Sequence, residues 1–173
     1  IGDSLAAVWM ERSCISPEDF AINHPAGALG KKLTLTAVDL MIPVAKLVPL
    51  YCSTALPEVI SRLTSDGVGA CWVANEGEKK ILQGLVTDGD LRRALQNNAP
   101  TDWSRLKAED LMTVDPITVP DYTLAVDAIE QMERNRKKSI AVLPVVDSEK
   151  KMLGLLRLHD LIQAGLANEF VSS

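Results

Sequence analysis

The sequence has few of the residues that mark metal-bound or disulfide-linked proteins. Only three cysteines occur among 173 residues, Cys14, Cys52 and Cys71, and none forms a Cys-x-x-Cys pair. His24 and His159 do not join them at the spacing of zinc ligands. We therefore expect no metal site, and free, mostly buried thiols in a reducing cytoplasm.

Excess basic charge and long apolar runs are also missing. The formal net charge is −5, which argues against a general nucleic-acid surface. No apolar stretch is long enough to cross a bilayer, and no signal peptide is visible. We expect a cytoplasmic globular protein whose partners include neither nucleic acid nor a membrane.

The chain also lacks an initiator Met. Leu5, Val8 and Trp9 recur at helical spacing from the first residues, so the chain starts at or near a helix. We expect a piece of a longer protein, whose upstream part would pack on that helix. A processed or tagged N-terminus is the alternative.

An internal duplication organises the rest of the chain. "VDLMIP" (38–43), "STALPEVISRL" (53–63) and "GLVTDGDLRRA" (84–94) return as "EDLMTV" (109–114), "YTLAVDAIEQM" (122–132) and "GLLRLHDLIQA" (154–164). The spacings are 71, 69 and 70 residues, measured from Met41, Thr54 and Gly84 to their counterparts. Two copies of one unit are therefore expected.

Each unit predicts the order β-α-β-β-α. Short extended runs come first, then helices that Thr54 and Thr123 would cap, then apolar runs rich in β-branched residues, "GACWVAN" and "SIAVLPVVD". A second strand leads to a final helix from about Asp90 or Asp160. One unit is too small to bury both faces of its sheet, so the copies should pair. The stretch "QNNAPTDWSRLKA" between them is polar, as a linker would be.

The stretch "GLVTDGDLRRAL" (84–95) carries the main candidate site. Gly84 lets backbone or ligand approach closely, and Thr87 places a hydroxyl near the end of the strand. A helix start favours an anion, and the Asp90 carboxylate suits the vicinal hydroxyls of ribose. The stretch therefore fits a nucleotide, although a plain helix cap would use the same residues.

The second copy has Gly154, Arg157 and Asp160 at the matching positions. A guanidinium replaces the hydroxyl, and it suits either a phosphate or a surface salt bridge. We expect His159 to be an exposed residue at the helix start and not a catalytic base.

Two β-α-β-β-α units that each end in Gly-apolar-apolar-x-x-x-Asp-Leu resemble a tandem pair of CBS domains over roughly residues 36–166. The resemblance implies an α/β pseudo-twofold module with two clefts that senses adenine nucleotides and regulates an attached enzyme or channel. It implies that Thr87 and Asp90 contact phosphate and ribose. In the second copy only Asp160 matches cleanly, and Arg157 departs from the pattern.

The first 35 residues belong to neither copy. "GDSLA…EDFAINHPAGALGKKL" followed by "VDLM" is similar to the junction of bacterial arabinose-5-phosphate isomerases, with Ala26 in place of a glycine. These enzymes join a sugar-isomerase (SIS) domain to two CBS domains. Three parts follow: an SIS remnant (1–35), CBS repeat 1 (36–98), and linker plus CBS repeat 2 (99–173).

The resemblance also implies a mechanism. Moving a proton between adjacent carbons through an enediol needs a base and a group that shuttles the hydroxyl proton. The histidine of the family's loop belongs to the active site, which points to His24 as a catalytic residue. The other catalytic residues would lie upstream of Ile1, so this chain alone should be inactive, and no cofactor is expected for catalysis.

Three functions remain open at this point. The first is the regulatory part of an isomerase that supplies lipopolysaccharide sugar (Kdo), sensing AMP, ATP or CMP-Kdo and helping to hold a homo-oligomer. The second is a stand-alone nucleotide-sensing CBS module with an unrelated partner. The third is a dimerising pair with empty clefts.

Overall fold

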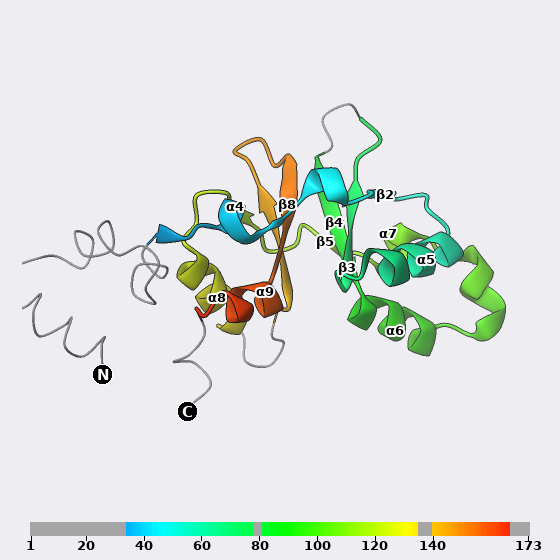
Figure 1. Ribbon diagram of the computed structural model, residues 1–173. Helices are drawn as coiled ribbons and strands as arrows, with labels where there is room; N and C mark the ends of the chain where they lie inside the picture. Colours follow the sequence, from blue (N-terminus) through cyan, green and yellow to red (C-terminus); the bar gives the residue numbers. More distant parts are fainter. Residues whose placement is uncertain (1–33, 78–80, 135–139, 167–173) are drawn as a thin grey trace, which may run out of the picture.

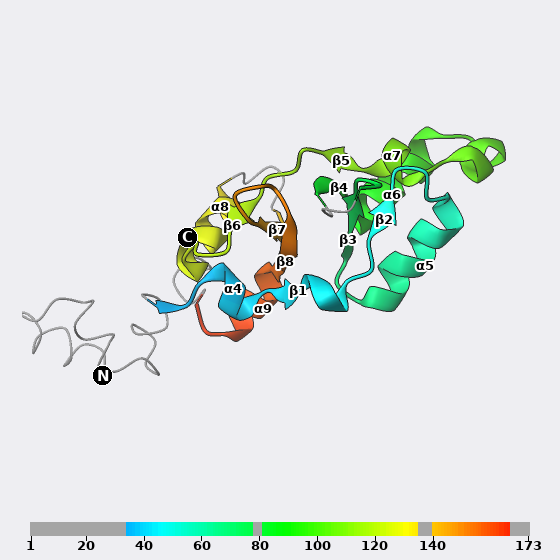
Figure 2. The same ribbon diagram turned by 90° about the horizontal axis from the view of Figure 1, so that it is seen from above.

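The fold consists of two similar lobes that lie side by side (Figures 1 and 2). The computed structural model describes residues 34–77, 81–134 and 140–166. Nearly all of the predicted SIS remnant, including His24, therefore lies outside the described residues.

Each repeat has the predicted β-α-β-β-α order, preceded by a short helix and a short strand. Repeat 1 contains α4 (Ala37–Leu40), β1 (Ile42–Pro43), the 3-10 helix η1 (Val44–Lys46), β2 (Leu50–Tyr51), α5 (Leu56–Asp66), β3 (Ala70–Ala74), β4 (Leu82–Thr87) and α6 (Asp88–Asn97). Repeat 2 contains the 3-10 helix η2 (Pro100–Arg105), α7 (Ala108–Leu111), β5 (Thr113–Val114), β6 (Val119–Pro120), α8 (Ala125–Glu133), β7 (Val142–Val146), β8 (Met152–Arg157) and α9 (Leu158–Gln163).

The strands form two four-stranded sheets with the orders β2-β3-β4-β5 and β1-β8-β7-β6. In each sheet a parallel pair, β2–β3 or β6–β7, flanks an antiparallel hairpin, β3–β4 or β7–β8. The hairpins even shift register at matching places, between Val73 and Ala74 and between Val145 and Val146. The duplication seen in the sequence is thus a duplication of backbone geometry.

Each repeat gives its first elements to the sheet of the other. We call residues 36–43 arm 1 and residues 107–114 arm 2. Strand β1 of arm 1 pairs with β8, and β5 of arm 2 pairs with β4. Two isolated bridges repeat the exchange, Thr36 with Leu124 and Lys107 with Ala55. The repeat boundaries therefore delimit sequence units, whereas each lobe in space includes an arm of the other repeat (Figure 1).

The two matching glycines, Gly84 and Gly154, make room for these arms. A Cβ on Gly154 would lie 2.5 Å from the Ile42 carbonyl oxygen and 2.6 Å from Met41 Sδ. A Cβ on Gly84 would lie 3.0 Å from the Thr113 carbonyl oxygen. The close approach expected at Gly84 is therefore made by the backbone of an arm.

Burial of the paired sheets explains why two copies are needed. One apolar cluster draws on both repeats, with Trp72 and Leu85 of repeat 1 packed among Val142, Met152 and Leu155 of repeat 2. Trp72 is 1% exposed. Each lobe has one further cluster, which lies under its own helices. One sheet alone would leave the face of the shared cluster in water.

The predicted helix caps were wrong by one residue. Ala55 and Leu124, in extended conformation, cap α5 and α8, so Thr54 and Thr123 lie one residue before the caps. The Thr54 hydroxyl instead accepts a hydrogen bond from Tyr51 N–H at 2.9 Å. The carbonyls of both threonines accept N–H groups of the arms, at Ala108 and Ala37. The backbone of each threonine thus binds an arm by a hydrogen bond.

The predicted linker contains regular structure. Residues Pro100–Arg105 form η2, and the Trp103 indole donates to the Asn98 carbonyl at 3.1 Å. Trp103 packs against the cluster under α5 and α6, so it covers the chain's own core.

Candidate functional site

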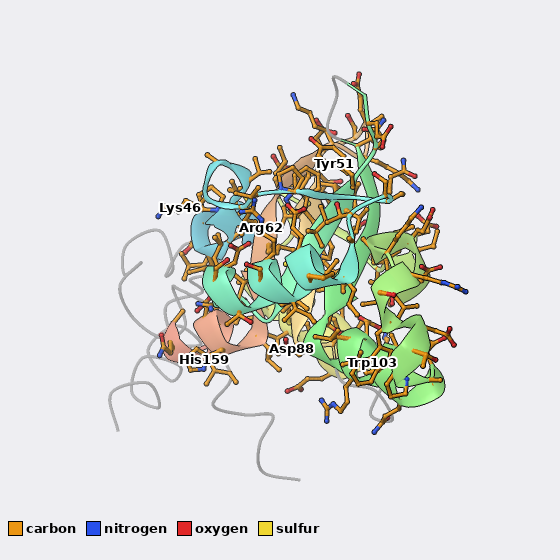
Figure 3. All side chains as sticks on the ribbon, turned by 90° about the vertical axis from the view of Figure 1, so that its right-hand side faces the viewer. Lys46, Tyr51, Arg62, Asp88, Trp103 and His159 are labelled. Atoms are coloured by element: carbon orange, nitrogen blue, oxygen red, sulfur yellow. The ribbon has the colours of Figure 1, made fainter. Side chains whose placement is uncertain are left out.

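A large cleft opens between the two lobes, where β4 and β8 end and α6 and α9 begin. Its volume is about 1300 Å³. It is lined by Leu63, Gly67, Val68, Gly69, Leu85, Thr87, Asp88, Gly89, Asp90, Arg93, Thr113, Pro116, Ile117, Ile140, Ala141, Val142, Arg157, Leu158, His159 and Ile162. Asp88 and His159 lie toward this end of the molecule, and Tyr51 lies at the opposite end (Figure 3). One cleft is therefore lined by the strand-to-helix turns of both repeats.

In repeat 1 the strand-to-helix turn forms a tight polar unit. Thr87 is the N-cap of α6, and its Oγ1 accepts the Asp90 N–H at 3.2 Å. The same hydroxyl donates to Asp90 Oδ2 at 2.6 Å, and Thr87 N–H donates to that oxygen at 2.9 Å. This reciprocal capping box satisfies backbone donors at the start of the helix. The predicted helix start at Asp90 was two residues late, since α6 begins at Asp88.

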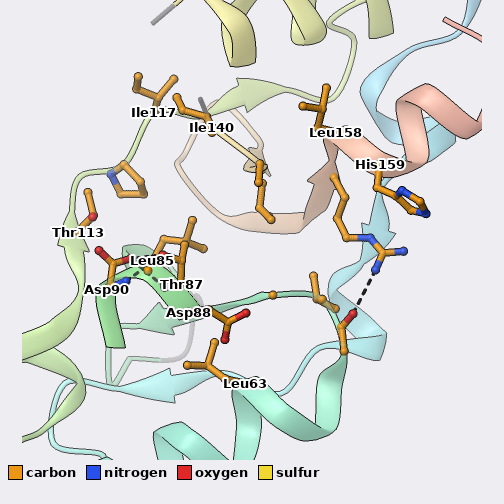
Figure 4. A pocket seen from close by; sticks show the side chains of 18 of the residues that line it. Leu63, Leu85, Thr87, Asp88, Asp90, Thr113, Ile117, Ile140, Leu158 and His159 are labelled. Carbon is orange, nitrogen blue, oxygen red and sulfur yellow. Dashed lines mark hydrogen bonds between the residues drawn. The ribbon is translucent and has the colours of Figure 1, made fainter. Parts of the chain in front are cut away.

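The Asp90 carboxylate is buried but remains part of the cleft wall. It is 8% exposed, and it lines the cleft together with Thr87 (Figure 4). Arg93 Nη2, one helical turn along, donates to Asp90 Oδ1. The Arg93 side chain is 58% exposed. Asp90 is thus a buried charge paired with a solvent-facing guanidinium.

Repeat 2 builds the matching turn from different chemistry. Arg157 Nε donates to Asp160 Oδ2 at 2.6 Å, and Nη2 donates to Asp160 Oδ1 at 2.7 Å. The fork of the guanidinium matches both oxygens of the carboxylate. This hydrogen bonding raises the pKa of Arg157 above its ordinary value, against the effect of burial. Of the two roles open for Arg157, the salt bridge is present.

Arg157 also reaches repeat 1. Its Nη1 donates to the Gly67 carbonyl at 3.2 Å, drawn as the dashed line beside the guanidinium in Figure 4. Gly67 ends α5 in the left-handed conformation, with φ of 62°, and Gly69 follows with φ of 77°. The loop 67–69 lines the cleft. A residue of repeat 2 therefore holds a cleft-lining loop of repeat 1.

The residues expected from the sequence are only partly brought together. Thr87, Asp90 and Arg157 line the cleft, whereas Asp160 does not. His159 lines it and is exposed, as expected for the start of a helix. His24 lies outside the described residues.

Sequence reasoning missed several residues of the cleft. The Arg93 contact follows from the i, i+3 spacing after Asp90, which was a usable signal. The Gly67 and Gly69 pair marked a turn. Ile117 follows arm 2 and is 56% exposed, and only the exchange of arms brings it to the cleft.

The described residues provide little for other kinds of site. Within residues 34–77, 81–134 and 140–166 no three His, Cys, Asp or Glu side chains are grouped so as to hold a metal ion. Cys52 and Cys71 are free thiols, and Cys14 lies outside these ranges. No helix in the described part of the chain has the length and apolar character needed to span a membrane.

Comparison with known proteins identifies two kinds of relative. The arabinose 5-phosphate isomerase KdsD of Pseudomonas aeruginosa is 38% identical over 166 residues, which is 96% of this chain and 49% of that protein. The protein of the same name from Francisella tularensis is 35% identical over 171 residues, covering 96% and 48%. The chain thus spans about half the length of the curated relatives it matches.

Solved structures agree with the fold. The crystal structure of CBSX2 in complex with AMP has a TM-score of 0.62 and 30% identity, and covers 76% of this chain and 96% of that one. The family model of the CBS domain matches residues 37–97 and 108–167, the two repeats found by self-comparison. The chain therefore belongs to the CBS domain family, as a pair of CBS domains.

Proposed function

We propose that this CBS pair is the regulatory portion of a sugar-phosphate aldose–ketose isomerase, and that its cleft senses a nucleotide or a nucleotide-sugar. The relatives that cover nearly the whole chain are arabinose 5-phosphate isomerases. A structural neighbour at 30% identity is a complex with AMP. Both similarities support the proposal.

The observation that carries the binding proposal is the wall formed by Thr87 and Asp90. A carboxylate that is 8% exposed lines an open cleft beside a hydroxyl and the start of a ten-residue helix. A carboxylate accepts hydrogen bonds from vicinal ribose hydroxyls, and a helix start with a hydroxyl suits phosphate. Apolar side chains such as Leu63 and Ile117 offer surface for a base. Arg157 adds a cation to the same cleft.

The parent protein would interconvert arabinose 5-phosphate and ribulose 5-phosphate for Kdo and lipopolysaccharide synthesis. In this proposal His24 shuttles a hydroxyl proton, and the remaining catalytic groups belong to an SIS core. The protein would work in the cytoplasm as a homo-oligomer held partly by its CBS pairs. This chain alone should not turn over arabinose 5-phosphate, and measurable conversion to ribulose 5-phosphate would overturn that point.

Calorimetric titration with AMP, ATP and CMP-Kdo tests the sensing role. We expect saturable heat with at least one ligand, and weaker binding of adenosine, which lacks the phosphate that Thr87 and α6 would hold. No heat with any of the three would reduce the pair to a structural role. The gene upstream of Ile1 tests the isomerase role, since the proposal requires an encoded SIS core there.

A further inference from the structure

The two halves of the cleft differ in whether their carboxylate forms part of the cleft wall. Asp90 lines the cleft, and its partner Arg93 has a side chain that is 58% exposed. Asp160 does not line the cleft, whereas Arg157, which holds both of its oxygens, does. In repeat 2 the guanidinium, and not the carboxylate that it binds, therefore forms the cleft wall.

The positions between these residues differ as well. Repeat 1 has Asp88 and Gly89 at the start of its ten-residue helix, and repeat 2 has Leu158 and His159 at the start of a helix of six residues. Gly89 presents no side chain, so a ligand can approach the backbone closely there. Repeat 2 has the imidazole of His159 at the position of Gly89, so its backbone is not open in the same way.

The Arg157 guanidinium is also fixed in place. Three of its nitrogens donate hydrogen bonds, two to Asp160 and one to the Gly67 carbonyl across the cleft. Its side chain is 28% exposed, about half the value of Arg93. Withdrawing it would leave a partly buried carboxylate without its ion pair, which is costly. Within the described residues Arg93 has no such cross-link, and it lies on an exposed helix face.

We infer that Arg157 closes the repeat-2 half of the cleft to ribose, so that each chain takes one nucleotide, in the half formed by Thr87 and Asp90. Arg157 acts there as a positioning residue, because it holds the loop 67–69 that lines the remaining half. This inference rests on the proposed nucleotide site. In this inference Asp90 binds the ribose of the ligand, and Thr87 with the start of α6 binds its phosphate.

The test is the number of AMP molecules bound per chain, measured by calorimetry on the wild type and on Arg157→Thr. The substitution gives repeat 2 the Thr-x-x-Asp arrangement of repeat 1 and frees Asp160. We expect one AMP per wild-type chain and two per Arg157→Thr chain. Asp90→Asn added to Arg157→Thr should return the number to one. Arg92→Thr, which changes an arginine of α6 that does not line this cleft, should leave it at one.

The outcomes separate the two proposals. Two AMP molecules on the wild-type chain would overturn the closure by Arg157 and leave nucleotide sensing intact. One AMP on a folded Arg157→Thr chain, as judged by circular dichroism, would show that the guanidinium is not what closes the second half. If neither protein binds AMP, ATP or CMP-Kdo, nucleotide sensing and the inference both fail. If Arg157→Thr does not fold, the wild-type number alone still decides between one site and two.

Discussion

The two repeats have the same backbone geometry where they pack on each other, and different side chains where they line the cleft. Both hairpins have the same register and the same bulge, and both hold an arm of the other repeat over a glycine. At the cleft, however, repeat 1 has Thr87 and Gly89 where repeat 2 has Arg157 and His159. Pairing of the sheets needs both copies to keep one geometry, but a ligand site needs only one copy to keep its chemistry. Symmetry of the fold therefore does not imply two equal sites.

The largest expected effect is on stability, and it comes from substituting the two matching glycines, Gly84 and Gly154. A Cβ at Gly154 would meet the Ile42 carbonyl at 2.5 Å, so Gly154→Ala must displace β1. At Gly84 the nearest atom is the flexible Met112 Sδ at 2.6 Å, and the nearest backbone atom is 3.0 Å away. Overpacking costs about 1–3 kcal/mol, and we expect Gly154→Ala near the upper end and Gly84→Ala near the lower.

Urea unfolding of the two variants measures this difference. Gly89→Ala is the control, because its Cβ would meet nothing nearer than 3.5 Å, and alanine suits a helix better than glycine. Its free energy of unfolding should be unchanged or slightly higher. Equal losses for Gly84→Ala and Gly154→Ala would contradict a backbone clash specific to arm 1.

The next effect sharpens the difference between the halves of the cleft. Asp90→Ala removes a carboxylate from the cleft wall, and hydrogen bonds to a charged group contribute about 1.5–3 kcal/mol each. We expect nucleotide affinity to fall at least about tenfold. Asp160→Ala should change affinity about twofold or less, since Asp160 does not line the cleft. Calorimetry measures both, and the reverse order would place the ligand in the other half.

A smaller effect concerns the thiol in the core of repeat 1. Burial, and then the negative charge of Asp66, raise the pKa of Cys71 from 9.0 to about 12. The folded state therefore holds the thiol proton more tightly, so this contribution to stability is full below pH 9.0 and is lost as pH rises toward 12. In the native protein Cys71 should react with a thiol reagent far more slowly than the half-buried Cys52.

Single-cysteine variants in a Cys14→Ser background separate the two thiols. Labelling of Cys71 should keep pace with global unfolding, and labelling of Cys52 should be faster at the same pH. Cys71 labelling as fast as Cys52 labelling in the folded protein would mean that the strand β3 opens locally.

The smallest effect compares the two arms. In arm 1 the Thr36 hydroxyl and N–H donate to Asp39 Oδ2 at 2.7 and 2.9 Å, and these bonds lower the pKa of Asp39 below 3.8. Arm 2 has Lys107 at the matching position, which offers no hydroxyl. A carboxyl group whose pKa is lowered on folding stabilises the fold at pH values above its pKa in the unfolded state. That stabilisation is lost as the pH falls through its pKa in the folded state.

Thr36→Val should therefore raise the pKa of Asp39, measured by NMR titration, and reduce the loss of stability below pH 3.8. Lys107→Met leaves Asp39 untouched and is the matched control. An unchanged pKa of Asp39 in Thr36→Val would mean that the hydroxyl is not its main partner.

Sequence reasoning succeeded where a signal was local or repeated. The echoes from Gly84 to Gly154 gave the unit, the β-α-β-β-α order and the pairing of copies. The prediction that Thr54 and Thr123 cap helices was wrong, because a threonine just before a helix can instead bind a neighbouring segment. It did not foresee that the Arg157 guanidinium crosses to Gly67, since no spacing within one repeat encodes a contact between repeats.

The amino-acid sequence by itself determined the duplicated unit, the capping box of Thr87 and Asp90, and the different residue at Arg157. Each depends on residues a few positions apart or on direct comparison of two stretches. Only the tertiary structure decided that the arms change lobes, that one cleft receives both helix starts, and that Arg157 rather than Asp160 lines it. Those facts depend on packing between segments far apart in the chain, where burial and close backbone approach outweigh local preference.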